Sequence, residues 1–155
     1  MTQITFISDT HSKHNQITKD LPGGDIIIHC GDISSQGYKY EIEEFCKWFD
    51  KLNYNNKIFI AGNHDFLFQE EADIAYQITK SYNINYLQDT FIIVNDIKIW
   101  GSPWTPKFGH WAFMLPANEL KLAEKWNNIV PDIDILITHG PAYNNLDQVI
   151  GRYEN

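Results

Sequence analysis

The feature of this sequence that most constrains the fold is an apolar run that passes directly into polar residues. Residues 58–61 read Ile-Phe-Ile-Ala, and Gly62-Asn63-His64-Asp65 follow without a spacer. Such a run is typical of a buried strand, and a glycine at its end lets the backbone turn sharply. Ligands gather at the carboxyl ends of strands in open sheets, so residues 62–65 are a candidate site. Taken alone, they fit a plain polar turn equally well.

The rest of the chain alternates between strand and helix patterns, which predicts an α/β fold. Short apolar, β-branched or aromatic runs predict strands at residues 2–8, 25–30, 58–61, 86–87, 91–94, 97–100 and 133–138. Asn95-Asp96 lies between two of these runs and predicts a tight hairpin. Apolar residues with helical spacing predict helices at residues 38–52, 70–80 and 122–130.

Length and composition predict one globular domain over residues 1–155. This length suffices for one sizeable core, and the 43% hydrophobic and 14% aromatic content argues against disorder. The net charge is −8, from 12 basic and 20 acidic residues, which argues against a general nucleic-acid surface. A local metal site could still attract phosphate.

The cysteines and the N-terminus favour a cytoplasmic protein. Cys30 ends an apolar run and Cys46 falls on the apolar face of a predicted helix, so we expect buried free thiols in a reducing compartment. Residues 1–4 do not resemble the start of a signal peptide. No apolar stretch approaches the roughly 18 residues of a membrane span, so we expect no membrane partner.

Four predicted strands end in residues of metal-ligand type. Each ending alone is a weak signal, because a single histidine after a strand is more often a hydrogen-bonded structural residue. Together they would deliver their side chains to one edge of the fold, and the mixture of carboxylate, amide and imidazole indicates Mn, Fe or Zn rather than Ca. A carboxylate can bridge two such ions, which can clamp a phosphoryl group when they lie about 3.5–4 Å apart. The endings are Asp9 with His11, then Asp32, then Asn63-His64-Asp65, then His139.

Other histidines and an aromatic segment have alternative interpretations. His14 is an exposed loop residue or approaches the phosphate, and His29 fits a hydrogen-bonded residue of the core. Residues 101–116 form a loop rich in Trp, Phe and Pro, in which His110 could touch substrate. We expect the aromatic side chains of this loop to pack against one another. The alternative is a stacking wall for a nucleoside or aryl group, built from Trp104, Phe108, Trp111 and Phe113.

The order and spacing of the strand endings resemble those of the calcineurin-like metallophosphoesterases. The resemblance runs over essentially the whole chain, and it implies a four-layer αββα sandwich that is incomplete at its C-terminus. Gly101-Ser102-Pro103-Trp104-Thr105-Pro106 and Trp111-Ala112-Phe113 further resemble a branch of small phosphodiesterases. The family motifs are matched by Asp9-Thr10-His11, Gly31-Asp32, Gly62-Asn63-His64-Asp65 and Thr138-His139-Gly140-Pro141.

The resemblance implies a dinuclear centre of divalent transition metal ions, with Mn favoured. Asp9 and His11 would hold the first ion, Asp32 would bridge both, and Asn63 and His139 would hold the second. A metal-bound hydroxide would attack the phosphorus of a small phosphodiester or phosphomonoester.

The resemblance also implies two catalytic residues beside the metals. His64 would act as the general acid that protonates the leaving oxygen. Asp65 would orient His64 without binding a metal ion itself.

The chain departs from the family pattern at its end. The Gly-His-x-His motif that normally follows gives one imidazole to each metal, and it does not occur through Asn155. Three explanations fit this departure: a domain truncated at its C-terminus, a partner or second copy that supplies ligands and covers the open sheet edge, or a genuine shortened form. The alternative to a hydrolase is therefore a catalytically impaired fragment or a relic that binds metal or phosphate without catalysis.

Overall fold

The structure of the protein is a computed structural model, which describes residues 1–117, 120–142, 144, 145 and 147. Its first sheet is wholly parallel and has the strand order β1-β2-β3-β4. Parallel neighbours require crossover connections, and helices supply most of them. The strands are β1 (Ile4–Ile7), β2 (Gly24–His29), β3 (Tyr54–Phe59) and β4 (Asn85–Tyr86).

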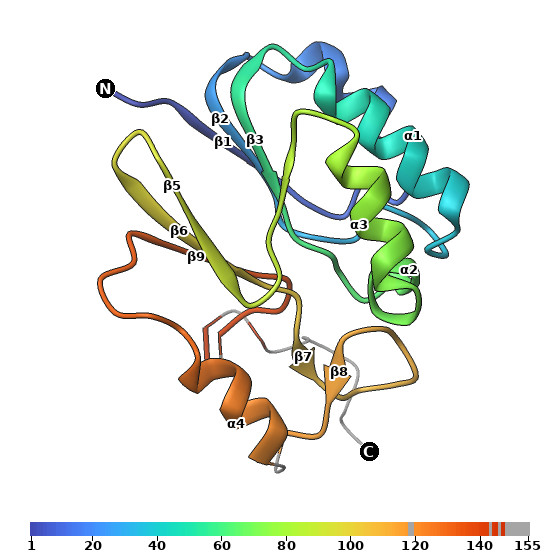
Figure 1. Ribbon diagram of the computed structural model, residues 1–155, viewed down its shortest axis with the longest axis vertical. Coiled ribbons are helices and arrows are strands. Elements are labelled where there is room, and N and C mark those ends of the chain that lie inside the picture. Colours follow the sequence, from blue (N-terminus) through green and yellow to red (C-terminus); the bar gives the residue numbers. More distant parts are fainter. Residues whose placement is uncertain (118–119, 143, 146, 148–155) are drawn as a thin grey trace.

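Helices cover one face of this sheet (Figure 1). They are the 3-10 helix η1 (His14–Asp20), α1 (Lys39–Asp50), the short α2 (Phe66–Glu70) and α3 (Ala72–Lys80). Phe45 and Phe49 of α1 are fully buried and pack against Phe59 of β3. The predicted helix at 38–52 is thus confirmed, and the predicted helix at 70–80 is α3.

A second sheet has the order β5-β6-β9, from β5 (Thr90–Val94), β6 (Ile97–Ser102) and β9 (Ile135–Thr138). β5 and β6 form the predicted hairpin, with Asn95 and Asp96 at φ 51° and 62°, which suits a tight turn. β9 pairs with β6 in parallel. The predicted loop at 101–116 carries a small ribbon of β7 (Thr105–Pro106) and β8 (Met114–Leu115).

The two sheets pack face to face through aliphatic side chains. Ile26 and Ile28 of β2 point toward the second sheet, whereas Ile27 between them belongs to the core under α1. A strand buried on both faces explains why β2 is apolar at successive positions instead of alternating. From the second sheet, Val94, Ile99 and Ile137 complete this inner core.

Helix α4 (Leu120–Asn127) lies on the side of the second sheet away from the first (Figure 1). The order of helices, sheet, sheet and helix confirms the predicted α/β sandwich. The predicted domain boundary at Asn155 lies outside the described residues. Within the part of the chain that the structure describes, no helix is long and apolar enough to cross a membrane.

Candidate metal centre

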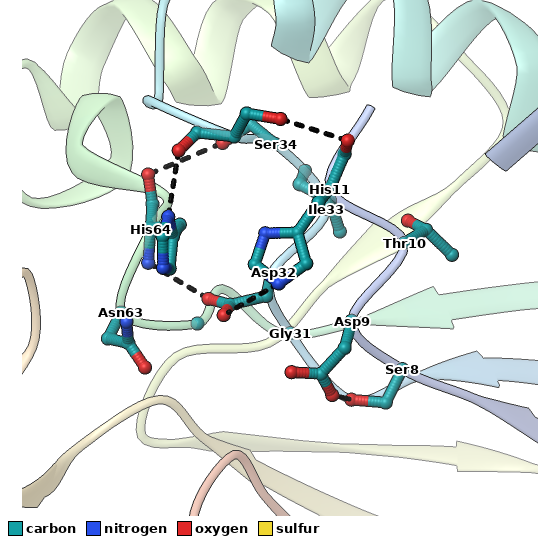
Figure 2. Close-up of polar contacts among 12 residues, drawn as sticks. Ser8, Asp9, Thr10, His11, Gly31, Asp32, Ile33, Ser34, Asn63 and His64 are labelled. Carbon is teal, nitrogen blue, oxygen red and sulfur yellow. Dashed lines mark hydrogen bonds and ion pairs between the residues drawn. The ribbon is translucent and has the colours of Figure 1, made fainter. Parts of the chain in front are cut away.

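The predicted ligands converge at the carboxyl ends of four strands. Asp9 and His11 follow β1, Asp32 follows β2, Asn63 follows β3, and His139 follows β9 of the second sheet. The first three strands are parallel neighbours, so their ends lie at one edge, and sheet packing brings the end of β9 beside them. Figure 2 shows Asp32 in the middle of the group, with His11 and Asp9 on one side and Asn63 on the other.

Two groups of candidate metal ligands share Asp32. His11, Asp32 and His64 each offer a ligand atom within 4.8 Å of the others, and so do Asp9, Asp32 and His139. One carboxylate oxygen of Asp32 lies 3.5 Å from His11 Nε2 and the other lies 3.4 Å from His139 Nε2. The structure therefore groups Asp9 with His139, whereas the sequence paired Asp9 with His11. The ion that each residue holds stays a prediction.

Asn63 extends the group around His139. Its Oδ1 lies 3.1 Å from His139 Nε2, and the other ring nitrogen of His139 lies 2.9 Å from the carbonyl oxygen of Cys30. A carbonyl oxygen can only accept, so Nδ1 of His139 carries a hydrogen and Nε2 faces the site. This is the arrangement of a metal-ligating histidine that is oriented by a backbone carbonyl.

The loops that carry the ligands hold an unusual backbone. Asp9, His11 and Asp32 have φ values of 55°, 42° and 55°, a region that non-glycine residues seldom adopt. Hydrogen bonds from Asp9 N to Gly31 O and from His11 N to Asp32 O, both 3.0 Å, join the first two loops beyond the ends of their strands. Residues held in such conformations by their surroundings cluster at functional sites.

Two glycines let the loops approach closely. A Cβ atom on Gly31, which has φ 102°, would lie 2.6 Å from His139 Nδ1. A Cβ atom on Gly62 would overlap the main chain and the carboxylate of Asp32, and would lie 2.8 Å from His139 Cε1. Real Cβ atoms essentially never approach other atoms below 3.0 Å, so both positions require glycine while the site keeps this geometry.

Charge and burial at Asp32 and His139 favour a cation between them. Asp32 is 3% exposed, and burial alone would raise its pKa, but the hydrogen bond with His139 and the one from the His64 backbone N–H hold that pKa below its ordinary value. Burial likewise opposes protonation of His139, yet the hydrogen bond and the charge of Asp32 raise its pKa to about 9. The carboxylate is thus ionised in a site that attracts positive charge. With the oxygen donors of Asp9 and Asn63 beside it, this site fits a divalent transition metal ion.

His64 is oriented by a different residue from the one predicted. Its Nδ1 lies 2.7 Å from the carbonyl oxygen of Ser35, and its backbone N–H donates to Asp32 Oδ1 at 2.9 Å. The carboxylate of Asp65 is fully buried and instead accepts hydrogen bonds from the Gly62 and Ser34 backbone N–H groups and from the Ser34 hydroxyl. Burial raises the pKa of Asp65 to about 6. Asp65 therefore ties the turn at 62–65 to the loop after Asp32, and Ser35 contacts the imidazole.

The aromatic segment is divided between packing and the site. Phe113 is fully buried and packs edge-on against Trp104, with ring centroids 5.3 Å apart, as expected for a loop packed by its own side chains. Trp111 instead lies on the ring of His64, and the next residue, Ala112, donates its backbone N–H to the carbonyl of Asn63. His110 and Phe108 are exposed.

The remaining histidines are buried. His14 is 1% exposed and stacks near Trp48, so the expectation of an exposed loop residue is wrong. The cause is η1, which turns His14 inward against α1, and the sequence carried no helical signal there. His29 is fully buried and hydrogen bonded, which confirms a residue of the core.

Cys30 and Cys46 are free thiols, and burial raises the pKa of Cys46 to about 12.

The fold and the convergent ligands are those expected of a calcineurin-like phosphoesterase domain, and comparison with known proteins agrees. Residues 2–154 match the calcineurin-like phosphoesterase family, so the chain belongs to that family. At the level of the family, the activity is metal-dependent hydrolysis of phosphoester bonds.

The chain is also similar to individual known proteins. "Metallophosphoesterase domain-containing protein 1" of Homo sapiens is 40% identical over 169 residues, which cover 96% of this chain and 51% of that protein. The "Probable rhamnogalacturonate lyase C" of Emericella nidulans is 35% identical over 95% of this chain but 14% of its own length. The crystal structure of the Thermus thermophilus protein TT1561 has a TM-score of 0.65 at 17% identity, over 96% of this chain and 73% of that one. The last likeness shows the fold alone, and the chain spans about half the length of the first of these relatives.

Proposed function

We propose that this protein hydrolyses small phosphate esters at a pair of divalent metal ions. The observation that carries the proposal is the position of Asp32, whose two carboxylate oxygens face different histidines, His11 and His139. A carboxylate placed in this way can bridge two ions. Asp9, His11, Asn63 and His139 would supply the other protein ligands.

The ions, when bound, would neutralise charge on the phosphate and lower the pKa of a water molecule so that it can act as nucleophile near neutral pH. The mixture of oxygen and imidazole donors suits Mn, Fe and Zn, and we favour Mn because carboxylate and amide oxygens make up much of the set. Asp9, Asp32 and Asn63 supply these oxygens.

His64 would act as the general acid. Its Nδ1 donates to the carbonyl of Ser35, so Nε2 is left to give a proton to the leaving oxygen of the substrate. Asp65 would act indirectly, by positioning the turn that carries His64. Its carboxylate accepts hydrogen bonds from Ser34 and so holds this turn in place.

We favour a small substrate, and a phosphodiester above a monoester. The net charge of −8 opposes binding of a long nucleic acid. Two segments, 101–106 and 111–113, resemble those of small phosphodiesterases, and the second lies beside the site through Trp111. We further propose a cytoplasmic location, which the free thiols of Cys30 and Cys46 support.

We propose that a second copy of the chain covers the open edge of the second sheet. Among the described residues, β9 pairs with β6 on one side and is the last strand of its sheet. Its Leu136 is 48% exposed. Light scattering of the purified protein tests this, because a monomer over a wide range of concentration would contradict it.

The experiment that tests the function combines metal analysis with turnover. We expect about two Mn²⁺ per chain, and hydrolysis of bis(4-nitrophenyl) phosphate faster than that of 4-nitrophenyl phosphate. D32N should lose activity together with bound metal. H64Q should keep the metal and lose about 10²–10⁴-fold in kcat. D96N is the matched control, because it makes the same change in the exposed hairpin turn.

A non-catalytic relic that binds metal or phosphate is the alternative function. It predicts metal or phosphate binding that depends on Asp32, without turnover of either ester. Less than one tightly bound ion per chain, with no hydrolysis, would contradict the proposed function for this chain.

A further inference from the structure

We propose that His29 is a positioning residue for the metal centre, holding the loop of Asp9 and His11 against the turn that carries Asp32. The inference rests on the proposed function, because it concerns the ligands of that site. His29 is the last residue of β2 and is 0% exposed. Burying a polar side chain is unfavourable unless its hydrogen bonds are made, so both ring nitrogens need partners.

Each ring nitrogen of His29 contacts one of the two ligand-bearing segments. Nε2 lies 2.9 Å from the hydroxyl oxygen of Thr10, which stands between Asp9 and His11 in the chain. Nδ1 lies 3.3 Å from the backbone nitrogen of Gly31, the residue before Asp32. One imidazole therefore connects the loop after β1 to the turn after β2.

These two contacts fix the tautomer of His29. A backbone N–H can only donate, so Nδ1 accepts from Gly31. Nε2 then carries the hydrogen and donates it to the Thr10 hydroxyl. Burial keeps the ring neutral and lowers its pKa to about 3, so the arrangement persists across the physiological range.

The ring has little freedom to turn away from these partners. Phe45 and Phe49 of α1 both meet it edge-on, with centroids 5.3 and 6.5 Å away and interplanar angles of 82° and 86°. The main core thus sets the orientation of the imidazole. Its fixed donor in turn sets the place of Thr10.

The position of Thr10 matters because its neighbours have left-handed backbone conformations. Asp9 and His11 have φ values of 55° and 42°, so they depend on surrounding contacts to keep their geometry. The main-chain bonds from Asp9 to Gly31 and from His11 to Asp32 set the spacing of the two segments. The Thr10 hydroxyl adds a side-chain anchor between them.

The decisive test removes the acceptor and leaves the imidazole in place. T10V replaces the hydroxyl by a methyl group of similar size, and T10S restores the hydroxyl. Partners that orient ligands from outside the coordination sphere typically change metal affinity by about 10–100-fold. We expect T10V to lose Mn²⁺ affinity within this range, measured by calorimetry without substrate, and T10S to recover most of it.

Thr5 provides a matched control in β1, the strand that leads to Thr10. Its hydroxyl accepts a hydrogen bond of 3.0 Å from Tyr54, away from the metal ligands. T5V should lower the melting temperature about as much as T10V does, while its Mn²⁺ affinity stays at the level of the unsubstituted protein. Equal affinity in T10V and T5V would overturn the positioning role and leave the proposed function intact.

A second measurement needs no metal. Nitrogen-15 NMR of the histidine side chains should find His29 as the Nε2–H tautomer, with a resonance that moves in T10V and remains in T5V. An Nδ1–H tautomer would overturn the proposal. If the unsubstituted protein bound no Mn²⁺ at all, the proposed function itself would fail, and the positioning role with it.

Discussion

The indole ring of Trp111 stacks on the imidazole ring of His64, with centroids 4.3 Å apart and planes inclined by 29°. Trp111 comes from the loop between β7 and β8, and His64 from the turn after β3. The hydrogen bond of 3.0 Å from Ala112 N to Asn63 O holds the two segments together. Nδ1 of His64 also contacts the carbonyl oxygen of Ser35. The Ser35 contact restrains the ring of His64 at its edge, and Trp111 restrains it on one face.

We expect W111A to lower kcat by about three- to tenfold, since a stacked aromatic pair contributes about 0.5–1.5 kcal/mol. W111F should keep most of the activity, because a phenyl ring can still cover the imidazole. Steady-state kinetics with an aryl phosphodiester measures the effect.

F108A is the control for this change, because Phe108 belongs to the same loop and is 71% exposed. It should leave kcat unchanged. An effect of W111A on KM alone would show that Trp111 contacts the substrate and does not orient His64.

Glu41 links the loops on both sides of the site. Its carboxylate is 4% exposed, and burial alone would raise its pKa, but four hydrogen bonds outweigh this and hold the pKa below 4.5. Two of the donors belong to residues beside the site. Ser12 follows His11 in the chain, and the carbonyl oxygen of Ser35 contacts the imidazole of His64. The donors are Ser12 Oγ and the backbone N–H groups of Ser35, Gln36 and Tyr38.

We expect E41Q to lower the free energy of unfolding by about 1–3 kcal/mol at pH 7, because an amide cannot accept all four bonds. The pKa of Glu41 is lower in the folded chain, so the unfolded chain takes up the proton first as pH falls. The stabilisation is therefore present above pH 4.5 and is lost below it. Urea denaturation should show a smaller difference between E41Q and the unsubstituted protein at pH 4 than at pH 7.

E43Q removes a carboxylate from the exposed face of the same helix, where it pairs with Lys39 at 3.7 Å. It should change stability by less than about 0.5 kcal/mol. A difference for E41Q that is independent of pH would contradict the role of the ionised carboxylate.

Gly62 is the position where added volume should disturb the site most directly. The methyl group of G62A would overlap Asp32 and lie within 2.8 Å of the His139 ring, so one of these ligands must move. We expect a loss of stability of about 1–3 kcal/mol and a marked loss of Mn²⁺ binding. Denaturation and calorimetry test the two effects, and full Mn²⁺ affinity in G62A would contradict the geometry of the centre.

The strand endings could be predicted because each is encoded in a few consecutive residues. An apolar run followed at once by a ligand-type side chain indicates both a buried strand and a residue at its end. The order of the motifs then indicated the family, which the comparisons confirmed. Asp9, His11, Asp32 and His139 follow their strands as this pattern requires.

By itself, then, the sequence determined the strands of the two larger sheets, the family and which residue types stand at the strand ends. Tertiary structure decided which partner each of them meets: Ser35 for His64, Trp111 over that same ring, and Thr10 with Gly31 for His29. The physical reason is that two of these contacts use backbone groups, which every residue carries, and that most join segments far apart in the chain. Contacts of these two kinds leave no local pattern in the sequence, because it is the packing of the loops that brings the groups together.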